Sequence, residues 1–249
     1  MKQTIALLAA AVGLAALAAP ASAQQQPVQR HLVYNFSVGV QDDSHDTDAS
    51  IKLTGGPTPG DNYGSGNTSY ASLTSDTGTI DVDIFGVESD GGLVVKVEEH
   101  AQRTNRTLNA VACVVYPTTN TVCGDGQVNP EEMAVLRTLS PRFFDPSSLD
   151  VKHHWHEGND AAGISLDFTA GVPTGTLVPI TEDADQKTGG VQGNTLHGTD
   201  TYTYDMSKNV ATELKEYDTI RRQTGVGQYT NSIIDITATL ATDSVTAKN

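Results

Sequence analysis

Apolar and polar side chains alternate along a segment near the N-terminal end of the sequence. Between residues 32 and 40 every second residue is apolar: Leu32, Tyr34, Phe36, Val38 and Val40. A period of two with one apolar face is typical of a half-buried β-strand. We therefore predict a strand over Leu32–Val40.

The clearest hairpin pattern lies between residues 80 and 97. Apolar residues again occupy alternate positions in both of its halves, Ile80–Ile84 and Leu93–Val97. The connecting Asp90-Gly91-Gly92 tolerates the positive φ values that tight hairpin turns require. The preceding stretch, Thr54–Thr79, is dominated by Gly, Ser and Thr, and this composition predicts a flexible loop.

A second hairpin is predicted around the two cysteines. Residues 111–116 and 121–123 are strand-like, and Pro-Thr-Thr-Asn at 117–120 supplies the turn. Cys113 and Cys123 are placed symmetrically about this turn, so their Cα atoms would lie near the separation of about 4.4–6.8 Å that a disulfide needs. We expect a Cys113–Cys123 disulfide, with two buried thiols as the alternative.

Residues 129–141 carry the signals of a short helix. Asn129 is a favourable N-cap and Pro130 suits the first helical position, while Glu131 and Glu132 meet the positive end of the helix dipole. Pro141 ends the pattern. We predict one short helix near residues 130–139, with an apolar side made of Met133, Val135, Leu136 and Leu139.

The last third of the sequence returns to strand patterns joined by short turns. The predicted strands are residues 164–168, 176–180, 195–204, 210–222 and 229–240. Successive strands with short connections form an antiparallel meander. The predicted fold is therefore all-β: a strongly curved sheet, half-barrel or sandwich with one short helix, in a single domain over residues 24–249.

The first 23 residues have the pattern of a secretory signal peptide. Lys2 precedes an apolar run over residues 5–19, and Ala21-Ser22-Ala23 is a small-x-small cleavage signature. The Ala-rich style is bacterial, and we expect an exported protein, periplasmic or extracellular. No later stretch is as long and apolar, so no transmembrane segment is expected in the mature chain.

Charge excludes some partners. The 249 residues contain 15 Lys and Arg against 30 Asp and Glu, a formal net charge of −15. Nucleic acid is not expected as a partner, because its phosphates require a basic face. Many of the acids alternate with apolar residues, as Asp81 and Asp83 do, and are expected on the solvated side of a sheet.

Residues 124–132 resemble the second half of an EF-hand calcium loop. The resemblance places Asp125, Gln127, Asn129 and Glu132 at ligand positions five, seven, nine and twelve. Positions one and three fall on Thr121 and Cys123, where that family has acids. The alternative interpretation is a glycine turn followed by a capped helix start.

The sequence His153-His154-Trp155-His156-Glu157 is a second candidate for metal binding. In an extended segment His154 and His156 share one face, a spacing at which two imidazoles can chelate Zn²⁺ or Cu²⁺. A third ligand is not evident from the sequence. The alternative is an exposed strand edge whose tryptophan packs on the core.

Motifs for nucleophilic, nucleotide-dependent or zinc-protease catalysis are absent from the sequence. The first hypothesis is therefore a non-enzymatic binding or carrier protein for an apolar or amphiphilic ligand, held on a concave β surface. A cell-surface interaction module, with residues 54–79 as its contact loop, is the second. A metal-dependent enzyme or metal-binding protein using His154 and His156 is the third. No cofactor is expected under the first hypothesis, with Zn²⁺ or Ca²⁺ as the alternatives.

Overall fold

The computed structural model describes residues 27–46, 68–102, 106–107, 110–117, 121–126, 128–140, 143–148, 153–159, 163–188, 194–225 and 228–246. These residues form one antiparallel sheet, one α-helix, α1 (Pro130–Thr138), and a 3₁₀ turn at Pro146–Ser148. In chain order the strands are β1 (Arg30–Asp46), β2 (Thr68–Val87), β3 (Leu93–Ala101), β4 (Arg106–Thr107), β5 (Val111–Val115), β6 (Thr121–Cys123), β7 (His154–Asn159), β8 (Ile164–Ala170), β9 (Leu177–Thr188), β10 (Asn194–Asp205), β11 (Val210–Gly225) and β12 (Gln228–Val245).

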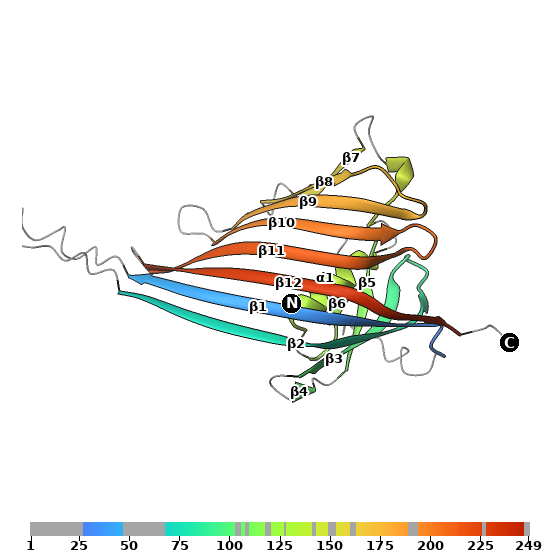
Figure 1. Cartoon of the computed structure of the whole chain (residues 1–249), viewed down its shortest axis with the longest axis horizontal. Coiled ribbons are helices and arrows are strands. Elements are labelled where there is room, and N and C mark those ends of the chain that lie inside the picture. Colours follow the sequence, from blue (N-terminus) through green and yellow to red (C-terminus); the bar gives the residue numbers. More distant parts are fainter. Residues whose placement is uncertain are drawn as a thin grey trace, which may run out of the picture.

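The sheet is open and strongly curved (Figure 1). Its strands follow the order β6-β5-β3-β2-β1-β12-β11-β10-β9-β8-β7, with β4 paired to β3 outside this path. The first and last strands of the chain, β1 and β12, pair at its centre over almost their whole length. The predicted all-β fold, a curved antiparallel sheet with one short helix, is confirmed.

Helix α1 lies on the concave side of the sheet and packs against β11 and β12. Its N-terminal end contacts β3 and its C-terminal end contacts β9. Six strand spacings of about 4.8 Å would separate β3 from β9 by about 29 Å in a flat sheet. A helix of nine residues is only about 14 Å long, so the sheet must wrap around it for both contacts to form.

The hydrophobic core fills the space between the concave face and α1. Inward-facing residues of β1, β2 and β3 contribute one side, and Val135 and Leu136 of α1 contribute the other. Aromatic residues close the core near β7 and β8, where the rings of Trp155 and Phe168 stack with their centroids 4.8 Å apart. The central part of the concave face is therefore occupied by the protein's own side chains.

The structure confirms the local predictions around the two hairpins and the helix. Cys113 pairs with Cys123 across β5 and β6, and the two sulfur atoms form a disulfide. Gly91, in the turn between β2 and β3, adopts a φ of 88°. The predicted apolar side of α1 was wrong for Met133, whose side chain is exposed, because Ala134 rather than Met133 faces the core.

The loop predicted over Thr54–Thr79 is wrong in its C-terminal part. Residues 68–79 belong to β2 and pair with β1 in continuous register, while residues 54–67 lie outside the described residues. Gly78 shows why composition misled the prediction: a Cβ there would lie 2.1 Å from the carbonyl oxygen of His100. The glycine thus allows close approach of β3 rather than marking a loop. The contact loop proposed for a cell-surface module, residues 54–79, is therefore shorter than predicted, because residues 68–79 are part of a strand.

The predicted signal peptide, residues 1–23, also lies outside the described residues. Within the described part of the chain, none of the helical segments has the length and apolar character needed to cross a membrane.

Candidate functional site

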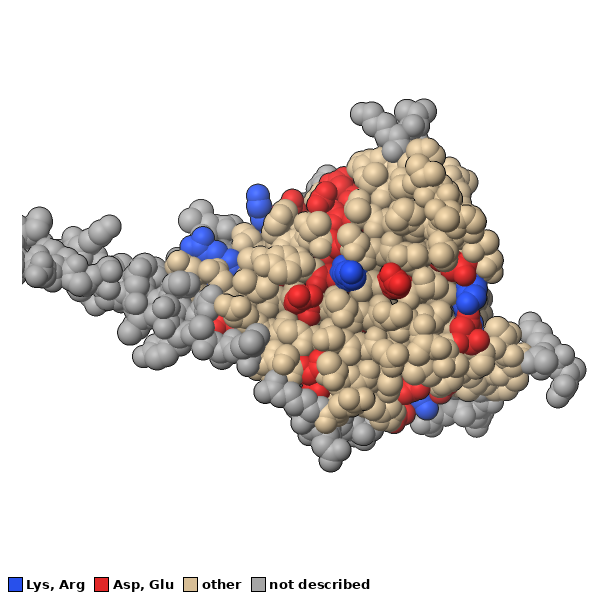
Figure 2. All heavy atoms as spheres, in the orientation of Figure 1, with Lys and Arg blue, Asp and Glu red and all other residues tan. Residues whose placement is uncertain are grey.

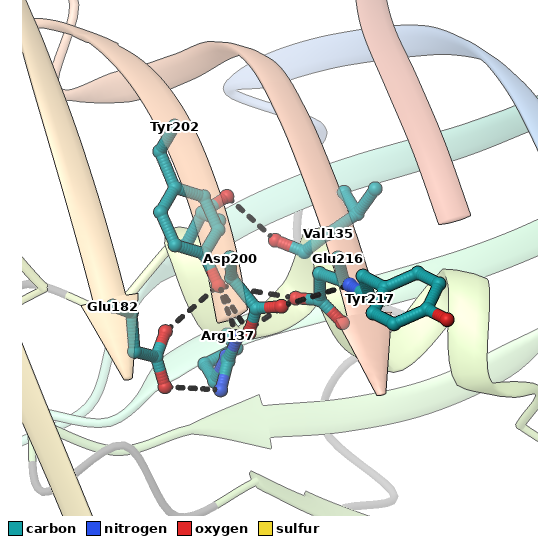
Figure 3. Close-up of polar contacts among 8 residues, drawn as sticks. Val135, Arg137, Glu182, Asp200, Tyr202, Glu216 and Tyr217 are labelled. Carbon is teal, nitrogen blue, oxygen red and sulfur yellow. Dashed lines mark hydrogen bonds and ion pairs between the residues drawn. The ribbon is translucent and has the colours of Figure 1, made fainter. Parts of the chain in front are cut away.

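The guanidinium of Arg137 is enclosed by carboxylates from three neighbouring strands (Figure 3). Its Nη1 donates to Oε1 of Glu182 on β9 at 2.9 Å. Its Nη2 donates to Oε1 of Glu216 on β11 at 2.8 Å and to Oδ2 of Asp200 on β10 at 3.2 Å. We call Arg137 with Glu182, Asp200 and Glu216 the Arg137 cluster.

Tyr202 joins the same network. Its hydroxyl donates to Oε2 of Glu182 at 2.8 Å and also contacts the guanidinium of Arg137. The other oxygen of Asp200, Oδ1, accepts the backbone N–H of Tyr217 at 3.1 Å. These bonds fix the carboxylates in place, so the helix end is anchored at three adjacent strands.

Burial perturbs the acids of the Arg137 cluster. It raises the pKa of Glu182 and that of Glu216 to about 7, and the positive charge of Arg137 offsets only part of each rise. Burial likewise raises the pKa of Asp200. One guanidinium faces three carboxyl groups, so burial favours the protonated form of these acids more than Arg137 favours the ionised form.

A second group of buried acids holds the N-terminal end of α1. The side-chain amide of Asn129 donates to Glu99 of β3 at 2.7 Å, and the Asn129 backbone N–H donates to Glu132 at 2.8 Å. Burial raises the pKa of Glu131 to about 7, and the neighbouring Glu99 adds to the rise. Both ends of α1 are therefore held to the sheet through buried carboxyl groups.

Two of the four residues of the calcium half-loop take part in this arrangement at the helix start. The side chain of Glu132 accepts the backbone N–H of Asn129, and the side chain of Asn129 donates to Glu99. The first bond caps α1, because the start of a helix leaves N–H groups that need partners. Asp125 is exposed in the turn before the helix, and Gln127 lies outside the described residues. The capped helix start is the interpretation that the geometry supports.

An open trough remains on the concave face beyond the Arg137 cluster. One cavity of about 150 Å³ adjoins Arg137, Asp200 and Asp218 and has Ile164, Leu166, Ala184 and Leu196 among its other lining residues. A neighbouring cavity of about 210 Å³ is lined by Gln186, Asn194, Thr195, Leu196 and Ile220. The two share Gln186 and Leu196, and we call them together the trough.

The register of the strands explains why the trough has one polar end. On β11 the inward positions run from Glu216 through Asp218 to Ile220, and Ile220 pairs with Leu196 on β10. Successive inward residues are two positions apart, so the lining passes from carboxylates to aliphatic side chains in about 7 Å per step. The trough is thus acidic next to α1, whereas further along the strands the aliphatic side chains of Leu196 and Ile220 lie beside polar residues and no carboxylate.

The predicted histidine pair lies on the opposite, outer face. His154 and His156 point away from the core on β7, while Trp155 between them is buried. Nδ1 of His156 lies 3.0 Å from Oδ1 of Asp167, and Nε2 of His154 lies 3.6 Å from the same oxygen. Among the described residues no group of three or more His, Cys, Asp or Glu is placed to hold a metal ion.

The outer face carries little positive charge. Figure 2 shows Asp and Glu in a band across the strands, on a surface that is otherwise mainly uncharged and has few Lys or Arg residues. Exposed acids such as Asp183, Asp185 and Asp235 alternate with buried neighbours along their strands. Here the expectation that acids occupy the solvated side of the sheet is met.

The buried acids were missed from the sequence, although a signal for them existed. In β10, Asp200 alternates with Tyr202 and Tyr204, so a period of two places it on the buried face. In β11, Glu216 follows Leu214 at the same spacing. An ionisable residue in phase with the apolar face indicates a buried partner, but the partner Arg137 is 45 or more positions away in the sequence.

These features define the class of protein as an all-β protein with one open, curved sheet wrapped around a short helix. No protein-family model matches the chain, and no curated protein does. Among solved structures, a lipovitellin structure described as "lipid-protein interactions in lipovitellin" aligns with 90% of this chain and 26% of that one, at 10% identity and a TM-score of 0.41. This chain spans about a quarter of that protein.

Proposed function

We propose that the protein is a non-enzymatic binding or carrier protein, and that the trough holds an amphiphilic ligand. The observation that carries the proposal is the set of aliphatic side chains on the inner face that α1 does not cover. Their members are half-buried: Ile164, Leu166, Leu196 and Ile220. The polar group of the ligand would face the Arg137 end.

The dimensions of the trough support this function. Ligand sites in proteins are concave and mostly apolar, with a few placed polar groups, and have volumes of about 300–1,000 Å³. The two cavities, of about 150 and 210 Å³, adjoin at Gln186 and Leu196, and only the two taken together reach the lower end of that range. Covering the aliphatic walls with an alkyl chain would contribute about 25 cal/mol for each Å² of apolar surface removed from water.

Export to an oxidising compartment is part of the proposal. The Cys113–Cys123 disulfide is consistent with it, as is the signal-peptide pattern of residues 1–23. Such a carrier would act outside the cytoplasm on ligands that are poorly soluble in water.

Equilibrium titration with N-phenyl-1-naphthylamine, an uncharged apolar fluorophore, tests the proposal. We expect saturable binding by the folded protein with one site per chain, and about a tenfold or greater loss of affinity in Leu196→Asn. The matched control is Leu177→Asn, because Leu177 is a partly exposed leucine of β9 that does not line the trough. Circular dichroism and melting temperature would establish that both variants remain folded.

Absence of saturable binding would refute the proposal, as would equal losses in the two variants. Native mass spectrometry of the protein purified from its source gives an independent check. An apolar adduct that dissociates on unfolding is the expected result.

A further inference from the structure

The polar end of the trough has an excess of negative charge. Arg137 is its cation, and that guanidinium is already bonded to Glu182, Asp200 and Glu216. Asp218 adds a further carboxyl group from the next inward position of β11. Among the lining residues of this cavity, the positive charge of Arg137 is therefore already paired with three acids, and the carboxyl group of Asp218 is additional to them.

Asp218 differs from the acids of the Arg137 cluster in its bonding. No hydrogen bond or ion pair involving its carboxyl group occurs within the described part of the chain, and its interactions with Asp200, Arg137 and His197 act over longer range. Burial together with the charge of Asp200 raises its pKa to about 6. At neutral pH it is thus an ionised, half-buried group that lines a cavity.

Gly198 makes the room that this carboxylate occupies. It pairs directly with Asp218 across β10 and β11, and a Cβ at position 198 would lie 2.1 Å from Oδ1 of Asp218. Any larger residue there would push the carboxylate out of its present position. The acid and the glycine opposite it together shape the polar end.

We propose that the trough selects amphiphiles with a positively charged ammonium headgroup, which binds at Asp218 while the alkyl chain lies along Leu166, Leu196 and Ile220. This inference rests on the proposed function and names its ligand class. A carboxylate partly removed from water is stabilised by a cation at short range. An anionic headgroup would meet the carboxylate of Asp218 and find Arg137 already bonded to Glu182, Asp200 and Glu216.

Competition among amphiphiles that share a twelve-carbon chain tests the headgroup. Each would displace N-phenyl-1-naphthylamine at concentrations below its micelle threshold: dodecyltrimethylammonium, dodecylphosphocholine, dodecyl maltoside and dodecanoate. We expect dodecyltrimethylammonium to displace the probe at a concentration at least tenfold lower than dodecyl maltoside, and dodecanoate to be the weakest. Dodecylphosphocholine reports whether an ammonium that is part of a zwitterionic lipid headgroup is also accepted.

Variants separate specific recognition from general attraction to an acidic protein. Asp218→Asn should abolish the preference for dodecyltrimethylammonium, so that this amphiphile and dodecyl maltoside displace the probe at similar concentrations. Gly198→Ala, which displaces the same carboxylate, should weaken the preference in the same direction. Asp235→Asn, at an exposed acid of β12 on the outer face, is the control that should retain it.

Two negative results are distinguishable. Binding of the probe with equal displacement by all headgroups, or a preference that survives Asp218→Asn, would overturn this inference and leave the proposed function standing. Failure of the probe and of every amphiphile to bind would remove the proposed function and this inference with it.

Discussion

Arg137 and Glu182 are 45 residues apart in the sequence, yet Nη1 of the arginine lies 2.9 Å from Oε1 of the glutamate. This ion pair connects the C-terminal end of α1 to the middle of β9. Glu182 is fully buried, and a buried carboxylate is tolerated only with a compensating charge or proton. The relationship therefore fixes the position of the helix and creates the polar end of the trough.

Removal of the arginine should destabilise the fold strongly at alkaline pH. In Arg137→Met three buried carboxyl groups lose their cation, and breaking a buried ion pair in this way costs about 3–5 kcal/mol. Urea denaturation at pH 8 would measure the change in free energy of unfolding. At pH 5 the loss should be smaller, because the acids are then protonated.

Arg222→Met is the matched control for this experiment, because Arg222 is exposed on β11. It should change stability by less than about 0.5 kcal/mol. Equal effects of the two substitutions would show that the Arg137 cluster has no special role in holding α1.

The buried acids predict that stability falls as the pH rises between about 4.5 and 7. Burial raises the pKa of Glu182 and Glu216 in the folded protein from 4.5 to about 7. Between these values the folded state binds more protons than the unfolded state, so its free energy advantage decreases with pH. Asp205 and Asp243, whose pKa values are lowered by hydrogen bonds to Ser207 and Arg30, act below this window.

Chemical denaturation at pH 5, 6, 7 and 8 checks this dependence. We expect a decrease of about 2 kcal/mol or more over the range, and a clearly shallower decrease in Glu182→Gln. Glu213→Gln, at an exposed acid of β11, should keep the slope of the unmodified protein. A stability that rises with pH over this range would contradict the account.

The disulfide should contribute about 2–3 kcal/mol to stability. Its two cysteines are separated by 10 positions, and closing a small loop restricts the unfolded chain by about this amount. The double variant Cys113→Ala/Cys123→Ala should show that loss in urea denaturation. A reducing agent should destabilise the unmodified protein and leave the double variant unaffected, whereas no effect on either would indicate that the bond adds nothing.

The histidine pair on β7 remains a candidate for zinc, and the structure gives a reason to expect little binding. Both imidazoles lie on an exposed surface beside the carboxylate of Asp167, and within the described part of the chain no group of three or more His, Cys, Asp or Glu is placed to hold a metal ion. We expect elemental analysis of the purified protein to find well under one zinc per chain. A stoichiometric amount of zinc that disappears in His154→Ala/His156→Ala would restore the third functional hypothesis.

Local patterns predicted the parts of the fold that depend on near neighbours. The alternation at Leu32–Val40, the Asn129-Pro130 helix start and the symmetric placement of Cys113 and Cys123 each describe contacts within a short segment or one hairpin. The pairing of β1 with β12 joins Arg30 to Val245, and no local pattern specifies such a long-range partner. The loop prediction was wrong for residues 68–79 for a related reason: their strand is stabilised by pairing with its neighbours rather than by intrinsic β propensity.

The sequence predicted the kind of site, a concave β surface, but not the residues that form it. Curvature suggested a concave surface, but its occupation by α1 follows from Arg137 meeting acids on three strands. Asp218 is two positions from Glu216 in sequence and therefore shares its face of β11, but this spacing does not show that Asp218 lines a cavity. The position of its carboxylate depends on Gly198, which pairs with Asp218 on the neighbouring strand β10. The sequence alone does not reveal this pairing.

Photoaffinity labelling with a long-chain alkyl diazirine tests the central claim most directly. After irradiation and proteolysis, mass spectrometry would locate the modified residues. The account predicts saturable labelling concentrated on the peptides that contain Ile164, Leu166, Leu196 and Ile220, suppressed by excess unlabelled amphiphile. Labelling that does not saturate, or that falls mainly on the exposed outer face around Tyr217, would contradict it.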